Sequence, residues 1–80
     1  MDSRKEVINL IKILGYPYSE VVMEFAIEDY EISSISYIDE TDKIILYKWY
    51  SDYEFQISYD DLEIKDQKIV LFELSKFISN

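Results

Sequence analysis

The stretch YEFQISYD at residues 53–60 alternates large apolar side chains with polar ones. Successive side chains of a β-strand point to opposite faces of a sheet, so this period of two predicts a half-buried strand. Its apolar set is Tyr53, Phe55, Ile57 and Tyr59. No other segment of the chain has so clear a strand pattern.

Two further strands are expected before it. Residues 43–50 are rich in β-branched and aromatic residues, and the short link Ser51-Asp52 joins them to the first stretch, as in a β-hairpin. Residues 31–38 form the preceding strand, which the polar turn at residues 39–42 closes. Strands that follow at a spacing of about eleven residues predict an antiparallel meander.

Residues 20–28 fit either a strand or a helix. Val21, Met23, Phe25 and Ile27 alternate, whereas some of the same residues also fit a helical face. On a helix, Glu20, Glu24 and Glu28 would form a mildly destabilising ladder of like charges, so a fourth strand is preferred.

A helix is predicted at each end of the chain. The first covers residues 4–14, with Ser3 and Glu6 as a capping box and with Gly15 and Pro17 ending it. Its main apolar face is flanked by Ile8 and Ile13, which predicts cover on more than one side. The apolar face consists of Val7, Leu10, Ile11 and Leu14.

The last helix is expected to be capped by Asp66, although residues 68–74 also fit a strand. Its apolar face consists of Val70, Leu71, Leu74, Phe77 and Ile78. The sequence therefore predicts one α+β domain over residues 1–80, with a meander of three or four strands between two helices. Both helices are expected on one face of the sheet, and the acidic residues on the other face and in the turns.

The composition sets limits on function. The chain of 80 residues has a net charge of −9, which argues against direct binding to nucleic acid or to an anionic membrane. The apolar stretch in the first fifteen residues is interrupted by Asn9 and Lys12 and has no cleavage site, and no apolar run is long enough to cross a bilayer. With no cysteine present, a cytoplasmic protein is expected, in the host cell if a phage encodes it.

Most catalytic chemistry is excluded by the residue types. The chain has no His, no Cys and a single Gly, so the common general base, thiol nucleophiles, zinc sites and glycine-rich phosphate loops are missing. The carboxylates at residues 39–42 and 60–63 lack the spacing of a calcium loop. No enzymatic activity, cofactor or metal site is predicted.

The acidic residues are segregated along the chain. Residues 13–42 and 49–64 together carry −13, and the other segments carry +4. Such a surface either keeps the protein soluble or faces a basic partner. The candidate partner-binding residues are Glu20, Glu24, Glu28, Asp29, Glu31, Asp39, Glu40, Asp42, Asp52, Glu54, Asp60, Asp61 and Tyr50.

Tyrosines are the expected anchors of such an interface, because they combine a large rigid ring with a polar tip. Tyr53 and Tyr59 are assigned to the core, which leaves Tyr16, Tyr18 and Tyr50 for exposure. About 30 Å of duplex DNA carries roughly 18 charges, of which about half face one side. Thirteen acids in two clusters are comparable with that number.

These features predict a non-catalytic inhibitor that occupies the groove of a basic nucleic-acid-binding protein. In size, acidity and lack of catalytic residue types the chain is similar to phage-encoded anti-restriction and anti-CRISPR proteins of the DNA-mimic type. This likeness is one of composition and includes no shared motif. The alternatives are an immunity protein or antitoxin that masks a basic nuclease, and a structural or regulatory subunit that forms a homodimer or larger homo-oligomer.

Overall fold

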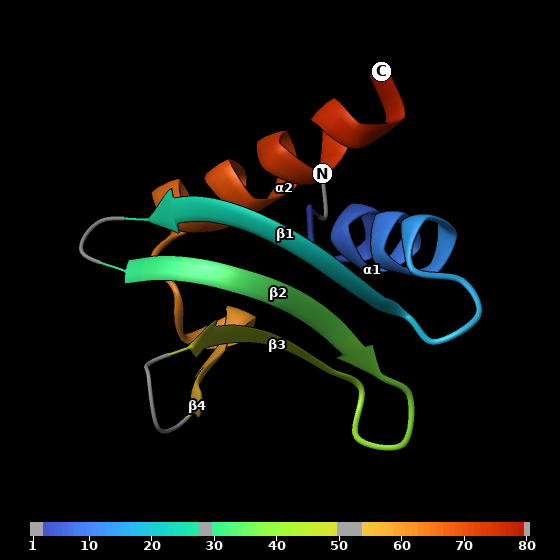
Figure 1. Cartoon of the computed structure of the whole chain (residues 1–80), viewed down its shortest axis with the longest axis horizontal. Helices are drawn as coiled ribbons and strands as arrows, with labels where there is room; N and C mark the ends of the chain where they lie inside the picture. Colours follow the sequence, from blue (N-terminus) through green and yellow to red (C-terminus); the bar gives the residue numbers. More distant parts are fainter. Residues whose placement is uncertain (1–2, 28–29, 50–53, 80) are drawn as a thin grey trace.

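The computed structural model describes residues 3–27, 30–49 and 54–79 and has two layers (Figure 1). One layer is an antiparallel sheet in the order β1-β2-β3-β4, and the other consists of the two terminal helices. The strands are β1 (Glu20–Ile27), β2 (Tyr30–Ile38), β3 (Lys43–Trp49) and β4 (Glu54–Ser58). The helices are α1 (Ser3–Leu14), the short 3-10 helix η1 (Tyr59–Asp61) and α2 (Ile64–Ser79). The predicted α+β meander with a helix at each end is confirmed.

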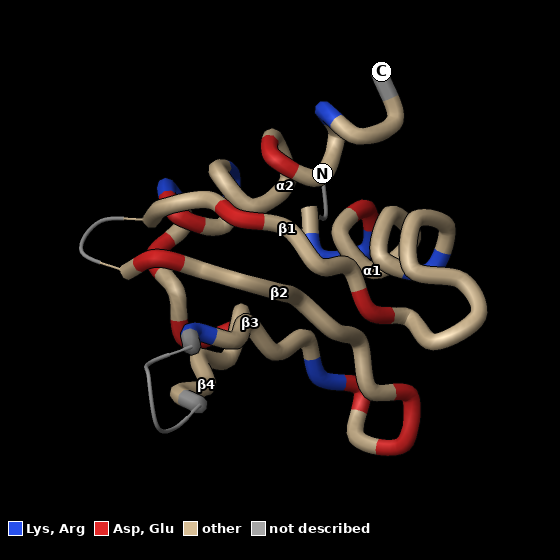
Figure 2. Tube along the Cα trace, in the orientation of Figure 1, with Lys and Arg blue, Asp and Glu red and all other residues tan. Residues whose placement is uncertain are grey.

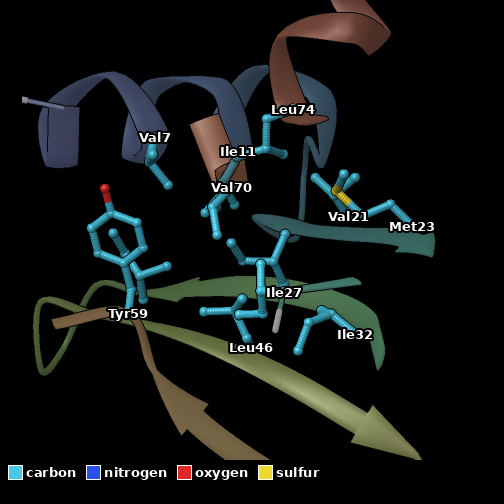
Figure 3. Packing of buried hydrophobic residues seen from close by; sticks show 12 residues of the cluster. Val7, Ile11, Val21, Met23, Ile27, Ile32, Leu46, Tyr59, Val70 and Leu74 are labelled. Carbon is cyan, nitrogen blue, oxygen red and sulfur yellow. The ribbon is translucent and has the colours of Figure 1, made fainter. Parts of the chain in front are cut away.

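The core lies between the sheet and the helices (Figure 3). The helices contribute Val7 and Ile11 from α1 and Val70 and Leu74 from α2, all fully buried. The strands contribute seven apolar residues whose side chains point towards the helices, and η1 contributes Tyr59. The seven strand residues are Val21, Met23, Ile27, Ile32, Ile35, Ile44 and Leu46. Burial of this single cluster is the main stabilising term for so small a domain.

The ambiguous segment before residue 28 is a strand. Its burial alternates along β1, with Val21, Met23 and Ile27 towards the helices and Val22 towards solvent. A β-bulge lies between Val22 and Phe25, where two residues of β1 oppose the single residue Ser33 of β2. Residues 28–29 and 50–53 lie outside the described residues, and with them the predicted Ser51-Asp52 link, Tyr50 and Tyr53.

The strand with the clearest sequence pattern is the shortest in the sheet. β4 ends at Ser58, and Tyr59 belongs to η1 instead of continuing the strand. Tyr59 is nevertheless buried, and its hydroxyl lies 3.3 Å from that of Ser3 in α1. The alternation therefore predicted the burial of Tyr59 but not the turn of the backbone there.

Three predictions about the helices are wrong. Ser3 is the first residue of α1 and contacts Tyr59, so it is not the cap of the helix. Ile13 is 65% exposed, so the cover predicted on that flank of α1 is wrong, whereas Ile8 on the other flank packs against the core and α1 contacts both α2 and the sheet. Asp66 is buried inside the first turn of α2, which begins two residues earlier at Ile64. Residues 68–74 belong to α2, so the alternative of a strand there is excluded. Phe77 and Ile78, near the end of α2, extend past the core and are half exposed.

Neither α1 nor α2 is long and apolar enough to span a bilayer.

Candidate functional site

The sheet has one face that the helices leave uncovered, here termed the open face. Because successive side chains of a strand point to opposite faces of the sheet, the residues that do not point towards the core lie on the open face. In β2 the alternation is interrupted at Ser33, opposite the β-bulge of β1, because Ile32 and Ile35 both lie in the core. The described residues of the open face are Glu20, Val22, Glu24, Ala26, Glu31, Ser34, Ser36, Ile45, Tyr47, Gln56 and Ser58. Lys43 and Ile38 pair with each other at the end of the same face.

Small polar residues form the floor of the open face. Ser34 and Ser36 lie in the middle of β2 and are only 6% and 8% exposed, because the larger side chains of the neighbouring strands flank them. Ser34 is paired with Tyr47, and Ser36 is paired with Ile45 and with Glu20. The Ser36 hydroxyl donates a hydrogen bond of 3.2 Å to the Glu20 carboxylate, which holds this side chain over the floor.

Three carboxylates lie on the β1–β2 half of the open face. Glu20, Glu24 and Glu31 are all exposed, and Glu31 is paired with Ala26, two residues along β1 from Glu24. Glu24 and Glu31 also line a pocket of about 370 Å³ beside the β-bulge, together with Ser33. Among the described residues, neither Glu24 nor Glu31 has an ion-pair partner.

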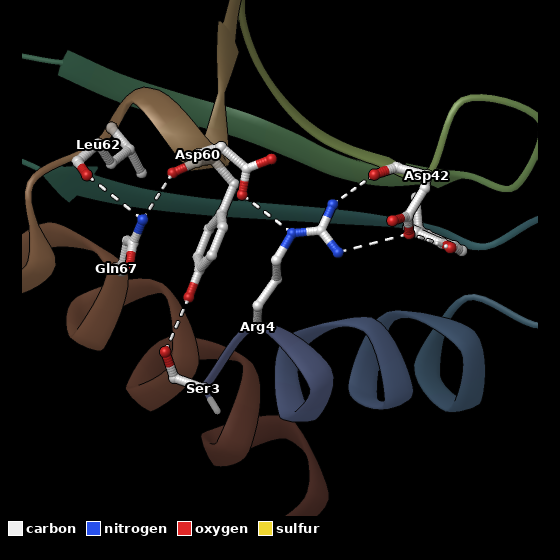
Figure 4. Close-up of polar contacts among 8 residues, drawn as sticks. Ser3, Arg4, Asp42, Asp60, Leu62 and Gln67 are labelled. Atoms are coloured by element: carbon white, nitrogen blue, oxygen red, sulfur yellow. Dashed lines mark hydrogen bonds and ion pairs between the residues drawn. The ribbon is translucent and has the colours of Figure 1, made fainter. Parts of the chain in front are cut away.

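Unlike the carboxylates of the open face, acids of the β2–β3 turn and of η1 lie beside basic side chains of α1 (Figure 4). The Arg4 guanidinium donates from Nε to Asp60 at 2.9 Å, and its terminal nitrogens donate to the carboxylate and the backbone carbonyl of Asp42. The Tyr37 hydroxyl donates to the Asp42 carboxylate at 2.7 Å. Lys12 lies 3.8 Å from Asp39. Asp39 and Asp42 thus lie in a turn, as the sequence pattern indicates, and together with Asp60 they are engaged with α1 and are not part of the open face.

This network shifts the pKa values of three groups, and the pKa of the Arg4 guanidinium is raised, first of all by its hydrogen bond to Asp60. Hydrogen bonds from Tyr37 and Arg4 stabilise the charged form of Asp42 and lower the pKa of its carboxyl. The same bond to Asp42, together with the negative charge of that carboxylate, raises the pKa of the Tyr37 hydroxyl. Asp42 is exposed and Tyr37 is partly buried, so the network fastens a surface turn to a helix.

Charge is divided between the two layers (Figure 2). α1 has three basic residues and one acidic residue, and α2 has three basic and two acidic residues, so the two helices together carry +3. Residues 15–63 contain thirteen acids and two bases and carry −11. The remaining negative charge is Asp2. The division seen along the sequence thus becomes a division between a basic helix layer and an acidic sheet with its turns.

A second pocket of about 370 Å³ lies between β4 and the start of α2. Tyr30 and Phe55 line it and stack on each other with ring centres 6.4 Å apart, and the Lys48 ammonium lies 5.4 Å from the centre of the Tyr30 ring. Three acidic residues, Asp61, Glu63 and Asp66, also line this pocket. This second carboxylate-bearing hollow was not predicted from the sequence, because it joins residues more than thirty positions apart.

Of the candidate partner-binding residues, the structure brings Glu20, Glu24 and Glu31 together on the open face. It places Asp39, Glu40 and Asp42 in the β2–β3 turn and Asp60 and Asp61 in η1. Glu28, Asp29, Asp52, Tyr50 and the side chain of Glu54 lie outside what is described. Tyr16 and Tyr18 are 83% and 85% exposed, as predicted.

No group of three or more potential metal ligands occurs in residues 3–27, 30–49 and 54–79. Comparisons of this chain with models of protein families, with curated proteins and with solved structures give no match.

Proposed function

We propose that this protein is a non-catalytic inhibitor that occupies the nucleic-acid groove of a basic protein with its open face. The observation that carries the proposal is the group of exposed carboxylates Glu20, Glu24 and Glu31 on a sheet face that no helix covers. A basic groove attracts such a face at long range and pairs with it at contact.

Size supports the same function. The longest dimension of the domain is 33 Å, which corresponds to about ten base pairs of duplex at roughly 3.4 Å each. A domain of that length can fill a groove built for one turn of DNA. The acids at either end of the sheet, such as Glu40 in the β2–β3 turn and Asp61 in η1, extend the negative charge beyond the open face.

The nature of the floor also supports a docking role. Ser34 and Ser36 leave the middle of the face shallow and polar, whereas Tyr47 and Val22 stand beside them. An arginine or lysine side chain of a partner can lie along this floor with its charged end at Glu24 or Glu31. An immunity protein or antitoxin that masks a basic nuclease would act by the same contacts, so the identity of the captured protein separates these cases.

The test is affinity capture with two variants of equal net charge. One changes Glu20, Glu24 and Glu31 to Gln, and its matched control changes Glu6, Glu63 and Glu73 to Gln. We expect the wild type and the control to capture the same basic nucleic-acid-binding protein and the open-face variant to capture at least about tenfold less. A duplex of about 30 base pairs should compete with capture.

Two results would contradict the proposal. One is equal loss of capture in both variants, which would mean that only net charge matters. The other is a captured partner that binds no nucleic acid or that duplex DNA does not displace. Circular dichroism and thermal unfolding of both variants exclude loss of folding as the cause of a lost capture.

A further inference from the structure

The side of α2 that faces away from the sheet carries an exposed stripe in which an aromatic side chain lies between two cationic ones. Lys68, Phe72 and Lys76 follow each other at intervals of four residues, and Phe72 is 62% exposed between the two cations. The Lys76 ammonium lies 4.9 Å from the centre of the Phe72 ring and 3.0 Å from Glu73. At about 1.5 Å of rise per residue, the two lysines are roughly 12 Å apart along the helix.

The edge strand β1 carries the complementary stripe. Glu20, Val22 and Glu24 alternate along the open face, and Val22 is 77% exposed between the two carboxylates. At about 3.3 Å per residue, the carboxylates are roughly 13 Å apart along the strand. An anion–apolar–anion stripe on β1 thus has nearly the same length as the cation–apolar–cation stripe on α2.

We infer that a second copy of this chain docks its α2 stripe on the β1 stripe of the first. In this contact Phe72 of one copy covers Val22 of the other, and Lys68 and Lys76 pair with the two glutamates. The contact is heterologous, because it joins different surfaces of the two copies, so it continues into a ring or an open chain.

Repulsion between like charges argues against a symmetric dimer in which α2 packs on α2 or β1 pairs with β1. An α2 stripe packed on its own copy sets Lys68 and Lys76 around a pair of phenylalanines, with no anion of the stripe to meet them. A β1 edge paired with its own copy sets Glu20 and Glu24 against the same residues, which guards this edge against sheet extension. Only the mixed contact pairs opposite charges at both ends.

The net charge of −9 opposes association at long range. At 0.1 M salt the screening length is about 10 Å, so charges at the contact outweigh the net charge of the whole molecule. Self-association covers the same carboxylates that the proposed function gives to a basic partner, so a partner that binds the open face competes with the second copy.

A charge-swap experiment tests this contact. A helix variant carries Lys68→Glu and Lys76→Glu, and a sheet variant carries Glu20→Lys and Glu24→Lys. By analytical ultracentrifugation at 0.1 M salt, we expect the mass of the wild type to rise from 9.6 kDa with concentration. Each variant alone should need at least about tenfold higher concentration, and an equimolar mixture should assemble again because its charges are complementary.

Several outcomes would overturn the inference. They are a wild type that stays monomeric at millimolar concentration, a mixture of folded variants that does not assemble, and a closed dimer that neither variant affects. Phe72→Gln changes no charge and should also weaken assembly. This variant tests the contact if a charge-reversal variant does not fold. The helix variant retains its open-face carboxylates, so loss of assembly with full capture of a basic partner separates this contact from the proposed function.

Discussion

Arg4 connects α1 to two parts of the chain that are distant from it in sequence. It is the second residue of α1, yet its guanidinium bonds to Asp42 in the β2–β3 turn and to Asp60 in η1. Asp42 has a positive φ of 53°, a conformation that Asn and Asp tolerate better than most residues. Replacing Asp42 by Asn therefore removes the charge while keeping the shape of the turn.

The Asp42 network makes the stability of the fold depend on pH. Because the pKa of this carboxyl is lower in the folded protein, its contribution is fully present above the unfolded value near 3.8 and is lost as pH falls through the folded value. We predict that Asp42→Asn reduces the loss of stability between pH 7 and pH 2, measured as the free energy of unfolding in urea. Glu40→Gln, in the same turn, is the control, and an equal reduction there would contradict the role of Asp42.

At the scale of elements, the junction between α1 and β1 is tightly packed. Gly15 is buried directly after α1, and a Cβ at this position would lie 2.5 Å from the backbone nitrogen of Glu20. The amide of Gly15 also donates to the carbonyl of Ile11 and closes the last turn of the helix. The loop returns the chain so closely that α1 and the edge strand meet without a side chain between them.

Gly15→Ala is expected to destabilise the protein by about 1–3 kcal/mol, because backbone and not a flexible side chain must move to admit the methyl group. The comparison is Asn9→Ala on the exposed side of α1, which should change stability by less than about 0.5 kcal/mol. Urea denaturation of both variants measures the difference. If Gly15→Ala were as stable as the wild type, the close approach of Glu20 would be wrong.

At the scale of the whole molecule, negative charge accumulates on one layer. Residues 15–63 carry −11, and the helices compensate only +3. Self-repulsion of this kind weakens a compact state and is screened by salt. The exposed ion pairs of Arg4 and Lys12 are screened as well, but surface pairs contribute little.

We therefore predict that sodium chloride raises the midpoint of thermal unfolding between 0.02 M and 0.5 M. A variant with Glu24, Glu31 and Glu40 changed to Gln should gain stability at low salt and respond less to added salt, because it has three negative charges fewer. Scanning calorimetry at several dilute protein concentrations checks this and shows whether assembly contributes. A midpoint that falls with salt would mean that the ion pairs outweigh the repulsion.

Local patterns in the sequence were sufficient to predict the order of the helices and strands and most of the buried apolar residues, although Ile13, Phe77 and Ile78 are exposed. Periods of two and of 3.6 are set by backbone geometry, so they revealed the four strands, the two helices and the burial of Tyr59 without knowledge of their neighbours. The like charges Glu20, Glu24 and Glu28 even decided between strand and helix for β1. The local pattern gave a wrong prediction where a contact distant in sequence determines the role of a side chain. Ser3, for example, contacts Tyr59 instead of capping its helix.

Which acids lie near one another and which are paired with bases depends on the tertiary structure. The sequence distinguishes the turn acids Asp39 and Asp42 from the strand acids Glu20 and Glu24, but it does not show which carboxylates have a basic partner. Packing α1 against the sheet brings Arg4 and Lys12 to the first group and leaves the second group on the open face. Such pairing depends on distances across the fold that no local period encodes, because electrostatic attraction acts between neighbours in space.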